Sequence, residues 1–235
     1  MTLKTLPLLI VLADLLVPTL MAAQPAVPPV NPAAYKAPVR VACIGDSITE
    51  GIGADQGKSY PAQLQNLLGN SWQVTNFGAS GHTLLKKGDA PYWNHPKYQD
   101  ALAFKPDVVI IMLGTNDTKP QNWQHHTEFA ADYKTFVKSF QDLASKPRIW
   151  ICRPCPVPDP GNFGISGANV KALIPRINAL ATQLHLGVID MHAALTDHPQ
   201  FLPDRVHPNT DGAAALASAA FTALTGKPAP APAAK

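Results

Sequence analysis

Five short apolar runs recur along the chain, at residues 39–45, 72–78, 107–114, 148–154 and 187–191. Most of them are continuous rather than alternating, which is typical of strands that are buried on both faces of a sheet. We therefore expect five short strands at the centre of the fold.

The segments between these runs carry the spacing of amphipathic helices. In residues 127–145 and 168–185, apolar side chains recur every three or four positions and so fall on one helix face. Further helices are expected over residues 60–69, with Ser59 as the N-cap, and over residues 211–226. The alternation of strand and helix predicts an α/β domain with a five-stranded parallel sheet and helices on both faces. In such a sheet, functional sites lie beyond the carboxyl ends of the strands.

The two ends of the chain differ in composition from the expected domain, residues 39–226. Residues 1–23 combine an early lysine, an apolar run and a small-residue end, which predicts an export signal and a periplasmic or secreted protein. An uncleaved anchoring helix is the alternative, and after cleavage we expect no stable membrane insertion. Residues 24–38 are rich in proline and alanine and predict a linker, and residues 227–235 predict a disordered tail.

Charge and cysteine content narrow the possible partners. The 235 residues include 19 Lys and Arg against 16 Asp and Glu, a formal net charge of +3. This weak excess, without a basic run, gives no support for nucleic-acid binding. Cys152 and Cys155 have the spacing of a redox motif, but the prolines beside them prevent the helix that such a motif opens. A small disulfide loop and free thiols remain open, as does the oligomeric state.

Residues able to perform nucleophilic catalysis fall at the ends of the predicted strands. A serine hydroxyl such as that of Ser47 needs a positioned base, and the base needs a group that fixes its tautomer. Only two residues separate Asp204 from His207, so a short turn can join carboxylate and imidazole and leave one ring nitrogen for Ser47. The backbone N–H groups of Ser47 and Gly81 and the side-chain amide of Asn116 are the expected donors to an oxyanion.

Four blocks carry these residues in order: GDSITEG, NFGASG, GTND and DRVH. Together they resemble the SGNH hydrolases, the GDSL-type esterase and lipase superfamily, over nearly the whole domain. The resemblance implies a three-layer αβα flavodoxin-like fold, ester hydrolysis through an acyl-serine intermediate, and neither a metal nor an organic cofactor. In the second block Gly78 is an alternative to Gly81, which is favoured because the family's glycine directly follows a serine.

The segment after Gly81 bears on the substrate. Residues 82–98 mix lysines, an acid and aromatic rings, which suits a hydroxylated alcohol better than a long acyl chain. This segment and GTNDTKPQNW also resemble exported bacterial SGNH esterases described as sialate or carbohydrate O-acetylesterases. Trp93 is the expected platform for a sugar ring, with attachment of the loop to the core as the alternative. Asp46 is expected to tie the turn after the first strand and is also a candidate substrate contact.

The predicted activity is hydrolysis of acetyl esters on carbohydrates by a Ser-His-Asp triad. A lipase or lysophospholipase and a broad-specificity arylesterase are the alternatives of the same class. A carbohydrate-binding module on an esterase scaffold is the non-enzyme alternative, against which a complete triad argues. A phosphate-transfer or receiver domain would need an acidic cluster to hold magnesium, and Asp46 alone is placed for that.

Overall fold

The protein is built around a parallel sheet of short, buried strands. The computed structural model describes residues 27–230. Neighbouring strands are all parallel and lie in the order β2-β1-β3-β4-β5. This confirms the predicted sheet, and the order is the flavodoxin-like one, in which ligands bind at the switch point between β1 and β3. The strands are β1 (Val39–Gly45), β2 (Trp72–Gly78), β3 (Val108–Met112), β4 (Arg148–Arg153) and β5 (Gly187–Asp190).

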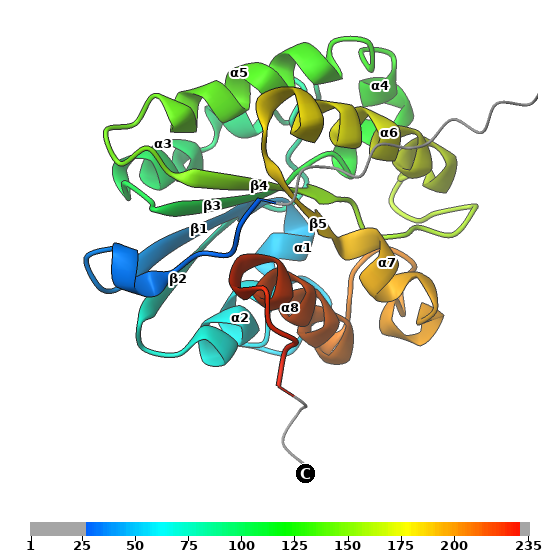
Figure 1. Cartoon of the computed structure of the whole chain (residues 1–235). Coiled ribbons are helices and arrows are strands. Elements are labelled where there is room, and N and C mark those ends of the chain that lie inside the picture. Colours follow the sequence, from blue (N-terminus) through cyan, green and yellow to red (C-terminus); the bar gives the residue numbers. More distant parts are fainter. Residues whose placement is uncertain (1–26, 231–235) are drawn as a thin grey trace, which may run out of the picture.

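Helices cover both faces of the sheet, so the fold has the expected three layers (Figure 1). Helices α3, α5 and α6 lie on one face, and α2, α7 and α8 lie on the other. The α-helices are α1 (Ser47–Glu50), α2 (Tyr60–Leu68), α3 (Pro96–Ala103), α4 (Pro120–Trp123), α5 (Phe129–Gln141), α6 (Gly167–Leu184), α7 (Met191–Thr196) and α8 (Thr210–Thr225). The 3₁₀ turns are η1 (Pro32–Ala34), η2 (Tyr92–Asn94), η3 (Asn116–Thr118) and η4 (Pro199–Phe201).

The four helices expected from apolar spacing are α2, α5, α6 and α8, with ends within a few residues of the predicted ones. Ser59 is the N-cap residue of α2, but its side chain makes no capping hydrogen bond. Its hydroxyl lies 3.4 Å from Asn76 Nδ2 instead. The first turn of α2 is therefore fixed by Pro61, whose missing N–H costs nothing at this position.

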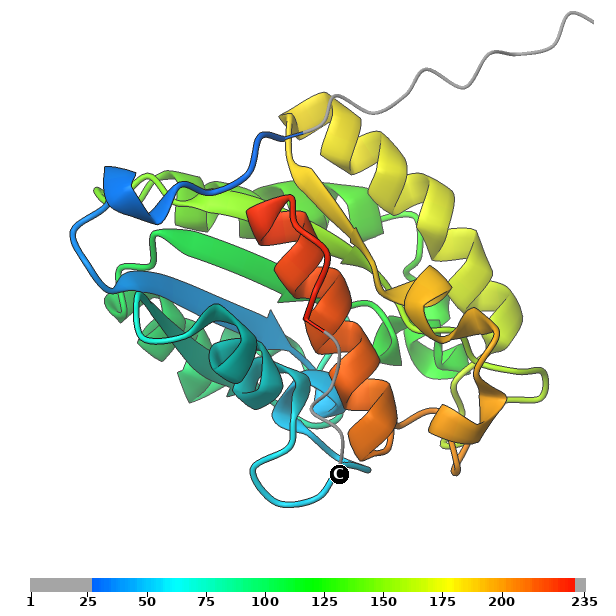
Figure 2. The same cartoon turned by 60° about the horizontal axis from the view of Figure 1, so that its bottom comes forward.

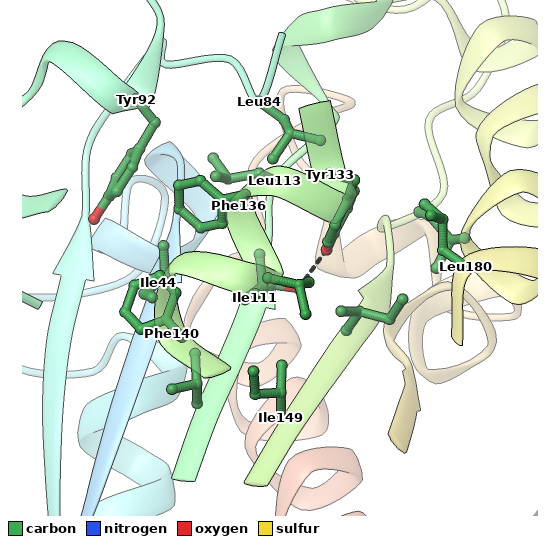
Figure 3. Packing of buried hydrophobic residues seen from close by; sticks show 14 of the residues in the cluster. Ile44, Leu84, Tyr92, Ile111, Leu113, Tyr133, Phe136, Phe140, Ile149 and Leu180 are labelled. Carbon is green, nitrogen blue, oxygen red and sulfur yellow. Dashed lines mark hydrogen bonds between the residues drawn. The ribbon is translucent and has the colours of Figure 1, made fainter. Parts of the chain in front are cut away.

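Each face of the sheet has its own hydrophobic core. Under α5, the rings of Phe136 and Phe140 are buried against Ile44 of β1 and Ile111 of β3 (Figure 3). Tyr133 belongs to the same cluster, and its hydroxyl donates to the Ile111 carbonyl at 3.4 Å. Full burial of such a side chain contributes roughly 1.5–3 kcal/mol. β1 and β3 are thus firmly held, and the residues that follow them start from a rigid base.

Part of the expected linker contacts the domain around Val30, although most of residues 27–38 are exposed. Val30 is 4% exposed, and its N–H donates to the Leu224 carbonyl at 2.7 Å. Arg148 Nη1 donates to the Pro29 carbonyl at 3.0 Å. Figure 2 shows this segment in blue on the side of the molecule where α8, in red, ends. The proline-rich composition gives no sign of this contact, because the contact depends on one apolar side chain, that of Val30.

The expected export signal, residues 1–23, lies outside the described residues, as do the start of the linker and the end of the tail. No helix within residues 27–230 is long and apolar enough to span a membrane.

All three cysteines are buried, free thiols, so the disulfide alternative for Cys152 and Cys155 is not realised. Burial raises the pKa of the Cys43 thiol to about 12. Burial also raises the pKa of the Cys155 thiol, well above its usual range. A thiol held neutral in this way is a poor nucleophile, and these side chains serve as small apolar groups in the core.

Candidate active site

Ser47 lies where β1 ends and α1 begins, at the carboxyl edge of the sheet. The turn is tight, because a Cβ at Gly45 would lie 2.0 Å from Thr49 Oγ1. Asp46 caps α1 by accepting a hydrogen bond from the Ile48 N–H at 3.0 Å. The strand, the glycine and the cap together deliver the Ser47 hydroxyl to the rim, where it is 7% exposed as a residue.

Asp46 is fully buried beneath this turn, which corrects the expected substrate contact. A carboxylate without solvent exposure cannot touch a bound ester, so its place is within the turn. Burial, the largest influence, raises the pKa of the Asp46 carboxyl to about 6 despite its hydrogen bonds. The sequence predicted that Asp46 ties the turn, but it did not predict that the carboxyl is fully buried.

Ser47, His207 and Asp204 form a continuous chain of hydrogen bonds. His207 Nε2 lies 2.9 Å from Ser47 Oγ, and His207 Nδ1 lies 2.7 Å from Asp204 Oδ2. The other carboxylate oxygen, Oδ1, accepts from the backbone N–H groups of His207 at 2.7 Å and Val206 at 2.9 Å. One carboxylate therefore fixes both the ring and the backbone of His207. The order of groups is that of nucleophile, general base and orienting acid.

The surroundings of Asp204 keep its carboxylate charged. Burial by itself raises the pKa of Asp204, but the hydrogen bonds from the backbone and ring of His207 and from the Val206 N–H outweigh it and hold the pKa below its usual value. An ionised Asp204 favours the protonated imidazole that forms when His207 takes the Ser47 proton.

The three expected oxyanion donors follow β1, β2 and β3. Asn116 opens η3 directly beyond β3, and its Nδ2 donates one hydrogen to the His82 carbonyl at 3.2 Å, which leaves the second hydrogen free to donate. The backbone N–H groups of Ser47 and Gly81 have no acceptor among the described residues. Donors held in place without a partner are suited to a developing negative charge.

The structure also separates the roles of Gly78 and Gly81. A Cβ at Gly78 would lie 2.2 Å from the Glu50 backbone nitrogen, and the Gly78 N–H already donates to Asn76 Oδ1 at 2.8 Å. Gly81 has φ +79° and open space where a Cβ would lie, so glycine is needed there for its backbone conformation. Gly78 thus packs β2 against α1, and Gly81 is the glycine with an available donor.

Asp117 is a site residue that the sequence analysis missed. It is fully buried, and its two oxygens accept from the backbone N–H groups of Leu84 at 3.0 Å and Leu85 at 2.7 Å. Burial, the largest influence, raises the pKa of Asp117 to about 7 despite these hydrogen bonds. The carboxyl ties the loop that follows Gly81 to the turn that carries Asn116. The feature of the sequence that could have revealed Asp117 is its position directly after Asn116 in the block GTND.

Trp93 is partly buried, and its contacts are with the core and with its own loop. Its indole N–H donates to the Leu84 carbonyl at 2.7 Å, and its ring packs on Phe136 at 5.0 Å and Tyr98 at 5.6 Å between centroids. Lys86 Nζ lies 4.4 Å above the ring. These contacts attach the loop to the core, as the alternative expected, and the sugar contact of Trp93 stays a prediction.

Comparisons with known proteins assign the family and the fold. Residues 43–215 match the model of the GDSL-like lipase/acylhydrolase family, and this range includes all the residues of the hydrogen-bond chain and the three oxyanion donors. The chain is also similar to a solved carbohydrate acetylesterase family member from Sinorhizobium meliloti, with a TM-score of 0.64 and 21% identity over 79% of this chain and 98% of that one. At this identity the likeness concerns the fold alone.

Two curated relatives are closer in sequence. The chain is 42% identical over 214 residues to an acetylxylan esterase of Xylanibacter ruminicola, a match that covers 82% of this chain and 44% of the relative. It is 32% identical over 135 residues to an acetylxylan esterase / glucomannan deacetylase of Cellvibrio japonicus, covering 57% and 33% of the two chains. This chain therefore spans less than half the length of these relatives.

Proposed function

Because the chain belongs to the GDSL-like lipase/acylhydrolase family, we propose that it hydrolyses acetyl esters on carbohydrates, with Ser47 as the nucleophile. The observation that carries the mechanism is the hydrogen-bond chain from Asp204 through His207 to Ser47, with links of 2.7 and 2.9 Å. A serine hydroxyl in this setting has a base within reach and the base has an orienting carboxylate.

Acylation begins when Ser47 Oγ attacks the ester carbonyl carbon and His207 Nε2 accepts the hydroxyl proton. The carbonyl oxygen becomes an oxyanion that accepts hydrogen bonds from the Ser47 and Gly81 N–H groups and the Asn116 amide. His207 then gives its proton to the oxygen of the leaving alcohol as the bond between that oxygen and the carbonyl carbon breaks. The acetyl group remains on Ser47 Oγ.

Deacylation repeats these steps with water in place of Ser47. His207 takes a proton from the water as its oxygen attacks the acetyl carbonyl carbon, and the same donors stabilise the second oxyanion. The proton then returns to Ser47 Oγ as the ester bond to serine breaks. Acetic acid leaves and ionises, and the free enzyme is restored.

The choice of acetylated carbohydrate rests on the relatives and on the site's surroundings. Both curated relatives are named for removing acetyl groups from polysaccharides, although this chain spans only part of each. The loop after Gly81 is polar, with Lys86, Lys87 and Asp89 exposed, and offers no continuous apolar surface. A lipase would instead need a large apolar surface for a long acyl chain.

The test compares acyl chains and natural esters on the purified protein. We expect kcat/KM for p-nitrophenyl acetate to exceed that for the octanoate at least about tenfold, because a pocket shaped for acetyl does not admit eight carbons. Acetate should also be released from acetylated xylo-oligosaccharides, with Ser47→Ala as the control for contaminating esterases. An octanoate preference without acetate release from any acetylated sugar would instead favour the lipase or lysophospholipase alternative.

We further propose that the protein acts outside the cytoplasm. The support is the export pattern of residues 1–23 together with the names of the curated relatives, since xylan and glucomannan are polymers that cannot cross a membrane. Sequencing the N-terminus of the protein recovered from the producing cells tests this, and an intact Met1 in the cytoplasmic fraction would contradict it.

A further inference from the structure

Two large apolar side chains are exposed among the described residues, and one of them, Phe163, lies beside the catalytic histidine. Ile52 is 45% exposed and Phe163 is 56% exposed. The Phe163 and His207 ring centroids are 5.3 Å apart, with an angle of 52° between the planes. At Gly53, next to Ile52, a Cβ would lie 2.9 Å from His207 Cβ. Two segments far apart in the sequence thus approach His207, and Phe163 brings an exposed ring to its imidazole.

Phe163 is exposed although its backbone adopts a costly conformation. Its φ of +54° lies in the left-handed region, which bulky side chains rarely occupy. The Phe163 N–H donates to Asn162 Oδ1 at 2.8 Å, and Asn162 Nδ2 donates to the Asp204 carbonyl at 3.1 Å. An exposed ring contributes little packing to offset this conformation, so stability does not account for Phe163. Strained residues of this kind are concentrated at functional sites.

The loop that carries Phe163 is fixed to the catalytic loop by a small apolar cluster. Val157 and Ile165, on either side of Phe163 in the sequence, belong to a buried cluster with Val206, which directly precedes His207. Val206 is 2% exposed and Ile165 is 5% exposed. The Phe163 ring is therefore held in a defined position relative to the imidazole.

We infer that Phe163 is the platform for the sugar that carries the acetyl group. This inference rests on the proposed function. His207 returns its proton to the oxygen of the leaving alcohol, so the alcohol half of the ester must lie beside His207 Nε2, whereas the acetyl carbonyl lies at Gly81 and Asn116. A pyranose presents apolar C–H groups on its faces, and these pack on aromatic and aliphatic side chains. Phe163 thus performs the role that the sequence suggested for Trp93.

The platform makes a prediction about which half of the substrate is recognised. Phe163→Ala should raise KM for acetylated xylo-oligosaccharides about 5- to 30-fold, the loss expected for one aromatic contact. The kcat should change much less, because deacylation takes place after the sugar has left and so does not depend on the platform. Ethyl acetate has no ring to pack, so the ratio of kcat/KM for the sugar ester to that for ethyl acetate should fall by a similar factor. The acetate-to-butyrate ratio measured with p-nitrophenyl esters should stay within about twofold.

Two further variants make the test decisive. Phe163→Trp keeps an aromatic platform and should retain most of the sugar-ester activity. Phe221→Ala makes the same truncation at a partly buried ring on α8. The helix starts three residues after His207, and Phe221 lies roughly 16 Å along it from that end, so this variant should leave the substrate ratio unchanged. Sugar-ester hydrolysis with an unaltered KM in Phe163→Ala would overturn this inference alone. Absence of acetate release from sugars by the wild-type protein would overturn the proposed function and the platform with it.

Discussion

Asp204 and His207 are joined by hydrogen bonds within a stretch of four residues, whereas the oxyanion donors are held by hydrogen bonds between segments more than 30 residues apart. Asp204 Oδ1 accepts from the His207 N–H three residues ahead. Asp117 accepts from Leu84 and Leu85, which lie 33 and 32 residues away. The first region takes its geometry from one turn, and the second takes it from the packed fold.

The two regions should therefore respond differently to substitution. The Asp204 side chain is 35% exposed, so water can replace part of what its hydrogen bonds contribute to the free energy of unfolding, and a substitution there acts mainly on the reaction. Asp117 is fully buried, so a substitution there leaves backbone N–H groups without an acceptor. Variants of the first region should therefore lose activity while keeping stability, and variants of Asp117 should lose some of both.

The largest effect is expected at the nucleophile and its base. Ser47→Ala and His207→Ala should each lower kcat by up to about a millionfold, because either change removes the attacking group or its activation. The double variant should be no slower than the single ones, since the two side chains act as one unit. Steady-state assays on p-nitrophenyl acetate check this, and activity within tenfold of wild type in either single variant would refute the mechanism.

A smaller loss is expected at Asp204, the member held by local contacts. Asp204→Asn should lower kcat by as much as about 10⁴-fold, because an amide can donate to His207 Nδ1 and stabilise the wrong tautomer. The midpoint of urea unfolding should stay close to that of the wild type. An inactive variant that is also strongly destabilised would show that this loop is no more separable from the fold than the oxyanion region.

The oxyanion side should show an intermediate effect. Asn116→Ala removes one donor and should lower kcat by about 10²- to 10³-fold with a smaller change in KM. Asn169→Ala is a matched control, because its amide donates to the Thr118 carbonyl of the same turn at 3.1 Å without being an oxyanion donor. A change in KM alone for Asn116→Ala would make Asn116 a binding residue and not a donor to the transition state.

The same contrast explains which features the sequence could predict. The strands were visible because buried parallel strands have continuous apolar runs, and the Asp204 to His207 pair was visible because its geometry depends on a short spacing. Gly81 and Asn116 were assigned from their positions at strand ends and from the family resemblance. All of these depend on local sequence or on the order of the elements.

What the sequence could not predict depends on which side chains meet after folding. Trp93 lies in a loop next to the site, and no pattern tells whether its ring faces a substrate or the core. Val30 lies in a proline-rich segment and is nevertheless buried. Phe163 is one aromatic residue in a loop of irregular sequence, and its proximity to His207 depends on contacts with a segment about 40 residues further along. In each case the outcome depends on which side chains pack together in the folded chain.

The smallest expected effect on the rate tests the link between the oxyanion region and the fold. Asp117→Asn should lower kcat about 10-fold, since the loop behind Gly81 loses one of the two hydrogen bonds that Asp117 accepts and a small misplacement of a donor is costly. It should also lower the free energy of unfolding by about 1–3 kcal/mol at pH 5, because the amide nitrogen cannot accept from a backbone N–H. Asp142→Asn, an exposed carboxylate that pairs with Lys138, is the control for the change in charge.

The pH dependence of that destabilisation identifies its cause. The pKa of Asp117 is raised on folding, from an ordinary value of 3.8 to about 7, so between these pH values the folded protein holds a proton that the unfolded chain releases. The wild-type contribution to stability therefore falls as the pH rises through this range, at up to about 1.4 kcal/mol per pH unit, and levels off above it. Asparagine does not titrate, so the difference in unfolding free energy between wild type and Asp117→Asn should narrow from pH 5 to pH 8. Urea unfolding at both pH values measures this, and a difference that stays constant or widens would mean that Asp117 is already ionised at pH 5.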